Sequence, residues 1–286
     1  MIFLILAIIC SATINWIFKL FGKFQIDEKT AIIFNYLTCS LIGQLMSQTF
    51  VFNEQNRGTE GFWFTVLLGI IFIIIFYCMA KTTAYFGIAV NVVSAKMAMI
   101  VPSLFFVFYL QEIFTWQIAA AVILALLAVI LINLKGLKNM KENRRFWLPV
   151  LVFLGSGIID TCMKWIDLKF LNGASPLAAT TQIFTGAFLV GFLWLILSKN
   201  KRLKTKNILA GIALGIPNFF SIFLLLKGIQ TLNNWTTATI FTTNNSAVIL
   251  VSALGGILFF KDKLTKLQWL GLFLSIISII LLQYVV

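Results

Sequence analysis

The segment SATINWIFK, residues 11–19, places three polar residues four positions apart in an otherwise apolar stretch. The segment SGIIDTCMK, residues 156–164, repeats this spacing 145 positions later. In a helix, residues four and eight positions apart lie within about 80° of one another and rise along one face. We therefore predict two helices that each carry one polar stripe. The stripe residues are Ser11, Asn15 and Lys19 in the first segment and Ser156, Asp160 and Lys164 in the second.

The composition of the chain is that of a membrane protein. Hydrophobic residues make up 60% of the sequence, charged residues make up 11%, and the mean hydropathy is +1.00. A helix needs about 20 apolar residues to cross a bilayer, and long uniform runs favour helices over the alternating strands of a barrel. We predict an all-α polytopic membrane protein with ten transmembrane helices. The expected spans are 2–22, 31–51, 62–82, 88–110, 116–134, 146–168, 176–198, 207–227, 235–260 and 268–285.

Other residues also recur at nearly the same spacing and divide the chain into two halves. A repeat of five helices is odd in number, so its second copy must have the opposite orientation in the membrane. We therefore predict two inverted five-helix repeats, residues 1–140 and 146–286. The recurring pairs are Gly69 with Gly215 and Lys81 with Lys227 after 146 positions, and Glu112 with Asp262 and Thr115 with Thr265 after 150 positions.

The end of each half resembles the drug/metabolite transporter superfamily, whose members have tandem EamA-like domains. The similarity lies in MIVPSLFFVFYLQEIFTWQ, residues 99–117, in ILVSALGGILFFKDKLTKLQWLG, residues 249–271, and in the duplicated ten-helix layout of the whole chain. The second stretch departs by having Ser252 where the first has Pro102. The resemblance implies a secondary carrier that works by alternating access, with a central cavity between the halves and no hydrolytic cofactor.

The formal net charge of +13 is concentrated in alternate loops. This distribution indicates contact with anionic lipid headgroups at one membrane surface, and not with nucleic acid. The positive-inside rule assigns these loops to the cytoplasm and both termini to the outside, whereas members of the family typically keep both termini inside. We expect a multi-pass protein of the bacterial inner (cell) membrane. Fifteen of the 17 loop Lys and Arg residues form this set: Lys23, Lys29, Lys135, Lys138, Lys141, Arg144, Arg145, Lys199, Lys201, Arg202, Lys204, Lys206, Lys261, Lys263 and Lys266.

Polar and charged residues deep in the apolar segments are the candidate substrate-binding residues. A Lys or Asp at the centre of a bilayer costs roughly 2.5–3.5 kcal/mol, which favours turning it toward a wet cavity inside the protein. Lys96 lies deepest, and the alternative is a structural lysine that bonds carbonyls freed by a kink at Pro102. A break is also expected beside Pro217. The candidates are Asn15, Lys19, Asn35, Asn91, Lys96, Asp160, Lys164, Asn218, Asn244 and Asn245.

Asp160 is the only acid deep within any predicted span. It precedes Lys164 by one helical turn, the favourable order for an ion pair on a helix. Since the chain has no histidine, Asp160 is also the candidate for proton coupling. The alternative is a static pair that orders the first and sixth helices. For Lys19, near the end of its span, the alternative is a snorkelling anchor.

Five lysines and one deep acid predict a positively charged cavity. We therefore expect a small anionic or zwitterionic substrate, such as an amino acid, a carboxylate or a phosphate-bearing metabolite. The cysteines have no paired spacing and there is no histidine, so we expect no metal site, no cofactor and no enzyme activity. The alternatives are a membrane-embedded lipid-modifying enzyme, which would need intramembrane catalytic clusters, and a non-transporting membrane assembly protein. Monomer and homodimer stay open.

The charge pattern predicts which loops are reached from outside the cell. In cysteine labelling of intact cells, Met140→Cys should be protected from a membrane-impermeant reagent, because the positive-inside rule places its loop in the cytoplasm. Arg57→Cys should react. The reverse pattern would place both termini inside.

Overall fold

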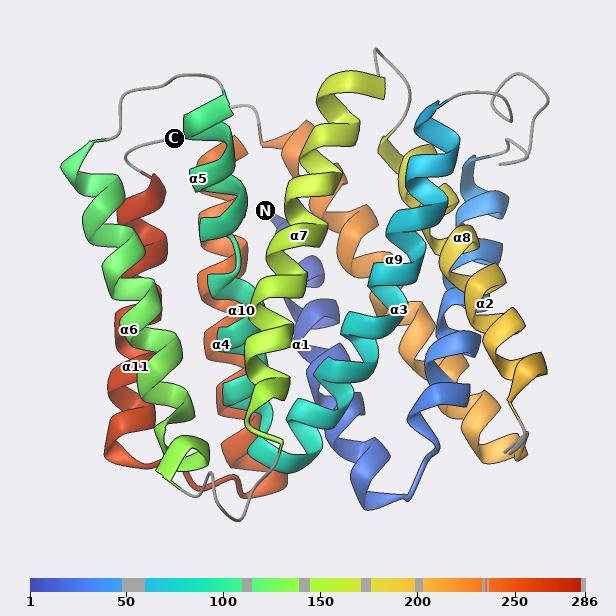
Figure 1. The fold of residues 1–286 in the computed structure, drawn as a ribbon, viewed down its shortest axis with the longest axis horizontal. Coiled ribbons are helices and arrows are strands. Elements are labelled where there is room, and N and C mark those ends of the chain that lie inside the picture. Colours follow the sequence, from blue (N-terminus) through green and yellow to red (C-terminus); the bar gives the residue numbers. More distant parts are fainter. Residues whose placement is uncertain are drawn as a thin grey trace.

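The structure is a computed structural model that describes residues 1–47, 60–109, 115–138, 145–170, 176–198, 203–232, 235 and 237–283. Within these ranges it contains eleven helices and no strand, which confirms the predicted all-α class (Figure 1). The helices are α1 Ile2–Lys23, α2 Glu28–Ser47, α3 Glu60–Phe86, α4 Ile88–Met97, α5 Ile100–Tyr109, α6 Trp116–Lys138, α7 Trp147–Phe170, α8 Pro176–Leu197, α9 Thr205–Thr231, α10 Thr237–Phe260 and α11 Lys266–Gln283.

Seven helical segments of the described chain are long and apolar enough to cross a membrane. Two more apolar stretches, Trp147–Met163 and Lys266–Leu281, are shorter. Each of the ten predicted spans overlaps one of these nine segments or α2, and the fourth span corresponds to α4 and α5 together. The count of ten membrane spans stays a prediction. The seven segments are Ile2–Lys23, Val66–Phe86, Ile88–Phe105, Trp116–Leu134, Thr180–Leu197, Thr205–Thr231 and Thr239–Phe260.

The fourth predicted span is broken, because α4 ends at Met97 and α5 begins at Ile100. We had placed the break at Pro102, and it comes about one turn earlier in the chain. A proline inside a helix lacks an N–H, and its ring clashes with the carbonyl four residues earlier, which here belongs to Ala98. That carbonyl instead accepts the N–H of Val101 at 2.9 Å. Pro102 therefore lies in the first turn of α5, where a proline is tolerated.

The other predicted break, beside Pro217, does not occur. Helix α9 is continuous from Thr205 to Thr231, with Pro217 in its interior. Transmembrane helices tolerate proline because neighbouring helices and polar side chains satisfy the freed backbone groups. The prediction of a break beside Pro217 was therefore wrong.

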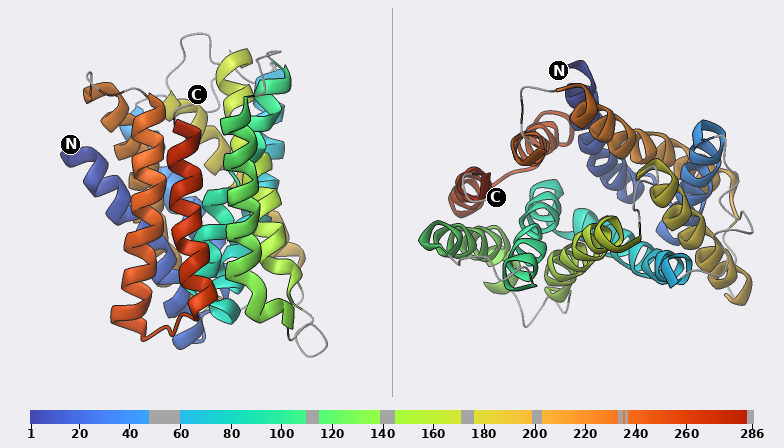
Figure 2. Two further views of the ribbon diagram at one scale, coloured as in Figure 1. Left: turned by 90° about the vertical axis from the view of Figure 1, so that its left-hand side faces the viewer. Right: turned by 90° about the horizontal axis from the view of Figure 1, so that it is seen from above.

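The bundle is elongated, with different helix pairs at its two ends. Figure 2 shows α6 and α11 at one end of the long axis and α2 and α8 at the other. Between them, α1 packs against α9 and α10, while α7 packs against α3, α4 and α5. Helix α4 also packs against α10. The four helices that carry most of the candidate residues, α1, α4, α7 and α10, therefore meet in the middle.

The lower end of the bundle in Figure 1 is here called the basic end. At this end α1, α3 and α10 finish and α2, α4 and α11 begin. Lysines of the predicted cytoplasmic loops lie here, and Lys23, Lys204, Lys206 and Lys263 among them are exposed.

Small residues allow the outer helices to approach one another closely. A Cβ atom added to Gly215 of α9 would lie 2.8 Å from the carbonyl oxygen of Asn35 on α2. Similarly, a Cβ added to Gly69 of α3 would lie 2.5 Å from the backbone nitrogen of Ala187 on α8. Contacts of this kind are typical of helix packing in membranes, where small residues let the backbones touch.

The close approach at Gly215 can be tested with a control on the same helix. Gly215→Ala should lower the melting temperature of the detergent-purified protein, because the methyl group overlaps α2 and costs about 1–3 kcal/mol. Gly228→Ala should be neutral or slightly stabilising, since its added Cβ would make contacts of 3.7–3.9 Å. Equal effects of the two changes would contradict the packing.

Candidate functional site

The polar stripe of α1 lies against α4 and α10. Asn15 is 4% exposed, and its Nδ2 donates a hydrogen bond to Ser252 Oγ of α10 at 3.3 Å. Its Oδ1 accepts a hydrogen bond from Asn91 Nδ2 of α4 at 2.9 Å. A buried amide is satisfied by such partners, and in hydrocarbon these bonds hold helices together. Asn15 therefore connects three helices through side chains.

Lys19, one turn further along the same face, forms an ion pair with Asp262. The Lys19 Nζ lies 2.8 Å from Asp262 Oδ1, and both side chains are largely shielded from solvent. Asp262 follows α10, and its Oδ2 also accepts the backbone N–H of Ile88 at 3.4 Å. The charge of Lys19 is thus paired with a carboxylate. We had predicted that Lys19 binds substrate or, as the alternative, anchors the helix at the membrane surface, and neither prediction included this ion pair.

Lys96 and Asp160 come from different helices and interact electrostatically. Lys96 is in the last turn of α4 and is partly exposed, whereas Asp160 is in the middle of α7 and is exposed. The charge of each residue acts on the other. Both side chains are described, and no direct ion pair joins them. The side chain of Lys164, the predicted partner of Asp160, lies outside the described residues.

Asp160 is exposed on a different side of α7 from the large apolar side chains. The outer face of α7 is a stripe of exposed apolar side chains, Trp147, Leu151, Leu154 and Ile158. At 100° per residue, Asp160 lies about 150° around the helix from the middle of this stripe. Its carboxylate is therefore exposed on the inner side of α7 and lies deep among protein atoms.

The alternative interpretation, a pair of Asp160 with Lys164 that orders the first and sixth predicted helices, stays a prediction because the Lys164 side chain lies outside the described residues. Helix α7 packs against α3, α4 and α5, and the charge of Lys96 on α4 acts on Asp160. An interaction across helices was not visible in the sequence, because Lys96 and Asp160 are far apart in the chain.

Several buried polar atoms on α4 and α10 have no hydrogen-bond partner among the described residues. They are Asn91 Oδ1 and Ser94 Oγ on α4, and Asn244 Oδ1 and Ser246 Oγ on α10. Buried acceptors and hydroxyls are normally paired with protein or water. The facing helices α4 and α10 therefore offer free hydrogen-bonding groups near Lys96. The neighbouring Asn245 differs, because its Nδ2 donates to Met99 Sδ at 3.7 Å.

Asn35 and Asn218 belong to another part of the molecule. Asn218 Nδ2 donates to Asn35 Oδ1 at 3.1 Å in the buried interface between α2 and α9. Cys39 joins them and donates to the carbonyl of Gly215 at 3.3 Å. The structure places this cluster as a link between two helices and does not bring it together with Lys96.

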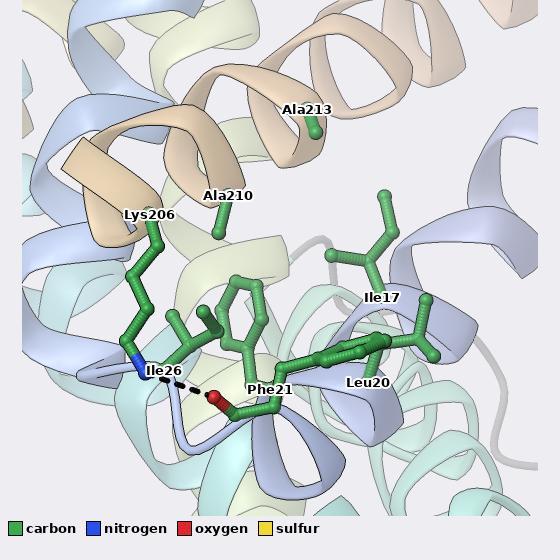
Figure 3. Close-up of a pocket in the computed structure, with 8 residues that line it drawn as sticks. Ile17, Leu20, Phe21, Ile26, Lys206, Ala210 and Ala213 are labelled. Carbon is green, nitrogen blue, oxygen red and sulfur yellow. Dashed lines mark hydrogen bonds between the residues drawn. The ribbon is translucent and has the colours of Figure 1, made fainter.

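A separate apolar groove lies at the basic end between the end of α1 and the start of α9 (Figure 3). Its volume is about 450 Å³, and Lys206 Nζ donates to the carbonyl of Phe24 at 3.1 Å on its rim. None of the predicted site residues lines it. The lining residues are Ile17, Leu20, Phe21, Phe24, Ile26, Lys206, Ala210 and Ala213.

Sequence reasoning missed two residues of the central polar network as site residues. Ser252 accepts from Asn15, and Asp262 binds Lys19. Both are in the C-terminal stretch that carries the family resemblance, which was the available signal. Their partners are more than 200 positions away in the chain, so no local spacing could identify the contacts.

Comparison with known proteins finds a family match in the second half of the chain. Residues 146–284 match the EamA-like transporter family, and this half of the chain is similar to that family. The match confirms the resemblance to the drug/metabolite transporter superfamily, and the apolar helices of the structure identify a multi-pass membrane protein.

Two further relatives cover nearly the whole chain. A protein of Haemophilus influenzae (strain ATCC 51907 / DSM 11121 / KW20 / Rd), described as an uncharacterized protein, is 28% identical over 288 residues, which is 98% of this chain and 97% of the relative. A crystal structure described only as that of a protein has a TM-score of 0.62 at 14% identity, and the match covers 99% of this chain and 96% of that one. The second likeness shows a shared fold.

Proposed function

We propose that this protein is a secondary active transporter that moves a small zwitterionic metabolite across the cell membrane by alternating access. The observation that carries the proposal is Asp160, whose carboxylate is exposed on the inner side of α7 and feels the charge of Lys96 on α4. Unlike charges that face a hollow in the middle of a membrane bundle are costly without a function. The similarity of residues 146–284 to a transporter family supports it.

Contacts between equivalent residues support an origin from two inverted repeats, residues 1–140 and 146–286. Ser40 Oγ of α2 and Thr185 Oγ1 of α8 lie 2.6 Å apart and are separated by 145 positions. Asn245 and Met99, in contact at 3.7 Å, are separated by 146 positions. These are the offsets that relate the two polar stripes and the two glycines. Under two-fold symmetry, a residue that contacts its own equivalent lies beside the axis.

The pairing of the helices gives the same support. If the halves exchange, α1 becomes α7, α2 becomes α8, α3 becomes α9, the α4–α5 pair becomes α10, and α6 becomes α11. The packing of α1 on α10 then corresponds to that of α7 on α4 and α5, and α2 on α9 corresponds to α8 on α3. The pair α6 and α11 is its own counterpart. In transporters, such halves exchange conformations to open the site on alternate sides.

The charge balance of the interior favours a zwitterion over a simple anion. We had counted five lysines, of which Lys19 is paired with Asp262 and Lys81 with Glu28 at 3.0 Å, while the side chain of Lys164 lies outside the described residues. Lys227 is exposed, with its Nζ over the rings of Phe3 and Phe223. Among the described side chains, Lys96 and Asp160 are then the charges that face the hollow. One cation and one anion match a substrate that carries a carboxylate and an ammonium group.

The arrangement assigns a role to each group. The ammonium of Lys96 binds the substrate carboxylate, and the carboxylate of Asp160 binds the substrate ammonium through charge-assisted hydrogen bonds. The unpaired polar atoms of Ser94 and Asn244 are hydrogen-bonding partners for the rest of the molecule. Asp160 is also the group that would carry a proton if transport is proton-coupled. No bond of the substrate is made or broken.

The orientation and the lipid contacts follow from the basic end. We propose that this end faces the cytoplasm and that both termini face outward, because its exposed lysines match the positive-inside rule. The membrane is the inner membrane of a bacterium, and anionic headgroups are the partners of these lysines.

Counterflow into proteoliposomes tests the site and the substrate class together. Purified protein should exchange a labelled zwitterionic amino acid with an unlabelled one, and less so a monocarboxylate or an amine. Lys96→Met and Asp160→Asn should each lower the rate at least about tenfold, because each removes a charge-assisted bond to the substrate. Lys227→Met is the matched control, and its flux should equal that of the unaltered protein.

Normal flux in Lys96→Met, with the protein inserted and monodisperse, would remove Lys96 from the site. Equal transport of the monocarboxylate and the amino acid would contradict the assignment of Asp160 to an ammonium group.

A further inference from the structure

We infer that Asp262, Lys19 and the first turn of α4 form a clasp that closes the transport pathway at the basic end. The inference rests on the proposed transport function and adds to it the residues that seal one side. In Figure 1 the ends of α1 and α10 and the start of α4 come together at the lower end. The clasp is defined by three residues, Lys19, Ile88 and Asp262.

A single carboxylate joins three parts of the chain. Asp262 Oδ1 lies 2.8 Å from the Nζ of Lys19, at the end of α1. Asp262 Oδ2 accepts the backbone N–H of Ile88, the first residue of α4, at 3.4 Å. A negative charge at a helix N-terminus is favourable because it meets the free N–H groups and the positive end of the helix dipole. The carboxylate therefore ties α1 and α4 to the connection between α10 and α11.

The backbone around Asp262 is shaped to hold the carboxylate in this position. Lys261 has a left-handed conformation with φ of 56°, and the N–H of Asp262 donates to the carbonyl of Gly256 at 3.0 Å. Gly87, whose φ of 95° favours glycine, and Gly256 lie beside the carboxylate, since an added Cβ on either would be in contact with Asp262 Oδ2 at 3.4 Å. The loop turns back and presents the carboxylate to α1 and α4.

The clasp connects the two proposed halves of the transporter. Lys19 and Ile88 belong to residues 1–140, whereas Asp262 belongs to residues 146–286. The other described ion pair, Lys81 with Glu28, joins α3 and α2 within the first half. If the halves move apart at the basic end to open the pathway there, the Lys19–Asp262 pair must break, but the Lys81–Glu28 pair can persist.

A fully buried polar layer lies directly inward of the clasp, and residues further inward are more exposed. The next layer inward is the hydrogen-bonded group of Asn15, Asn91 and Ser252, which are 4%, 0% and 0% exposed. Further along α4, Lys96 is partly exposed, and on α7 Asp160 is exposed. In the proposed pathway, this buried layer and the clasp close the basic side, and the site at Asp160 opens to the opposite end.

Labelling of one interior cysteine from the basic side tests the clasp. The reporter is Ser156→Cys, one turn from Asp160, in a chain whose four native cysteines are replaced by serine or alanine. In membrane vesicles with the basic side outward, a membrane-impermeant thiol reagent should react slowly with this reporter. Lys19→Met and Asp262→Asn should each raise the rate several-fold, because either change breaks the ion pair. Asn at position 262 can still accept the Ile88 N–H.

Glu28→Gln is the matched control, since it breaks an ion pair at the same end within one half, and its labelling rate should not change. Unchanged labelling in Lys19→Met or in Asp262→Asn, with folded protein by size exclusion, would overturn the clasp. The assay needs no substrate. Faster basic-side labelling in a protein that transports nothing would uphold the clasp and contradict the proposed function, and normal transport with unchanged labelling would do the reverse.

Discussion

The cost of placing charged and hydrogen-bonding groups in hydrocarbon is the constraint on which this structure depends. The outer faces of the helices carry large apolar side chains such as Ile158 and Phe273, which are 47% and 61% exposed. The polar residues of the same helices are turned inward, where Asn15 bonds to Asn91 and Ser252. Lys19 and Lys81 are each neutralised by a carboxylate. The charges at Lys96 and Asp160 have no direct ion pair between them, and we propose that they face a hollow inside the bundle.

This arrangement separates two kinds of polar contact. Asn35 with Asn218, and the glycines that pack α9 on α2 and α3 on α8, hold helices together. The groups on the inner sides of α4, α7 and α10 are only partly satisfied within the protein, as the unpaired atoms of Ser94 and Asn244 illustrate. A transporter must bind and release its substrate, so incomplete satisfaction in the empty protein is what such a site requires. The first kind fixes the scaffold, and the second is available to a ligand.

The sequence predicted features that depend on neighbouring residues, but not contacts between residues far apart in the chain. The helices and the inward direction of the α1 stripe follow from local hydrophobicity and from a spacing of four residues. The break near Pro102 was predicted, but its position at Ala98 and Met99 follows from a clash with a carbonyl one turn earlier. The pairing of Lys19 with Asp262 could not be predicted from local sequence patterns, because the two residues are far apart in the chain. Likewise, no local sequence pattern indicated that the charge of Lys96, on another helix, acts on Asp160. The charge count of the cavity changed for the same reason.

The central claim is that Asp160 faces water inside the bundle while the outer face of the same helix meets lipid. Spin labels at Asp160→Cys and Ile158→Cys in a reconstituted, otherwise cysteine-free protein measure this directly. Power saturation compares collisions with oxygen, which concentrates in lipid, and with a water-soluble nickel chelate. The account predicts that the label at 160 is reached mainly by the chelate and the label at 158 mainly by oxygen. If oxygen dominates at both positions, Asp160 faces acyl chains and the account is wrong.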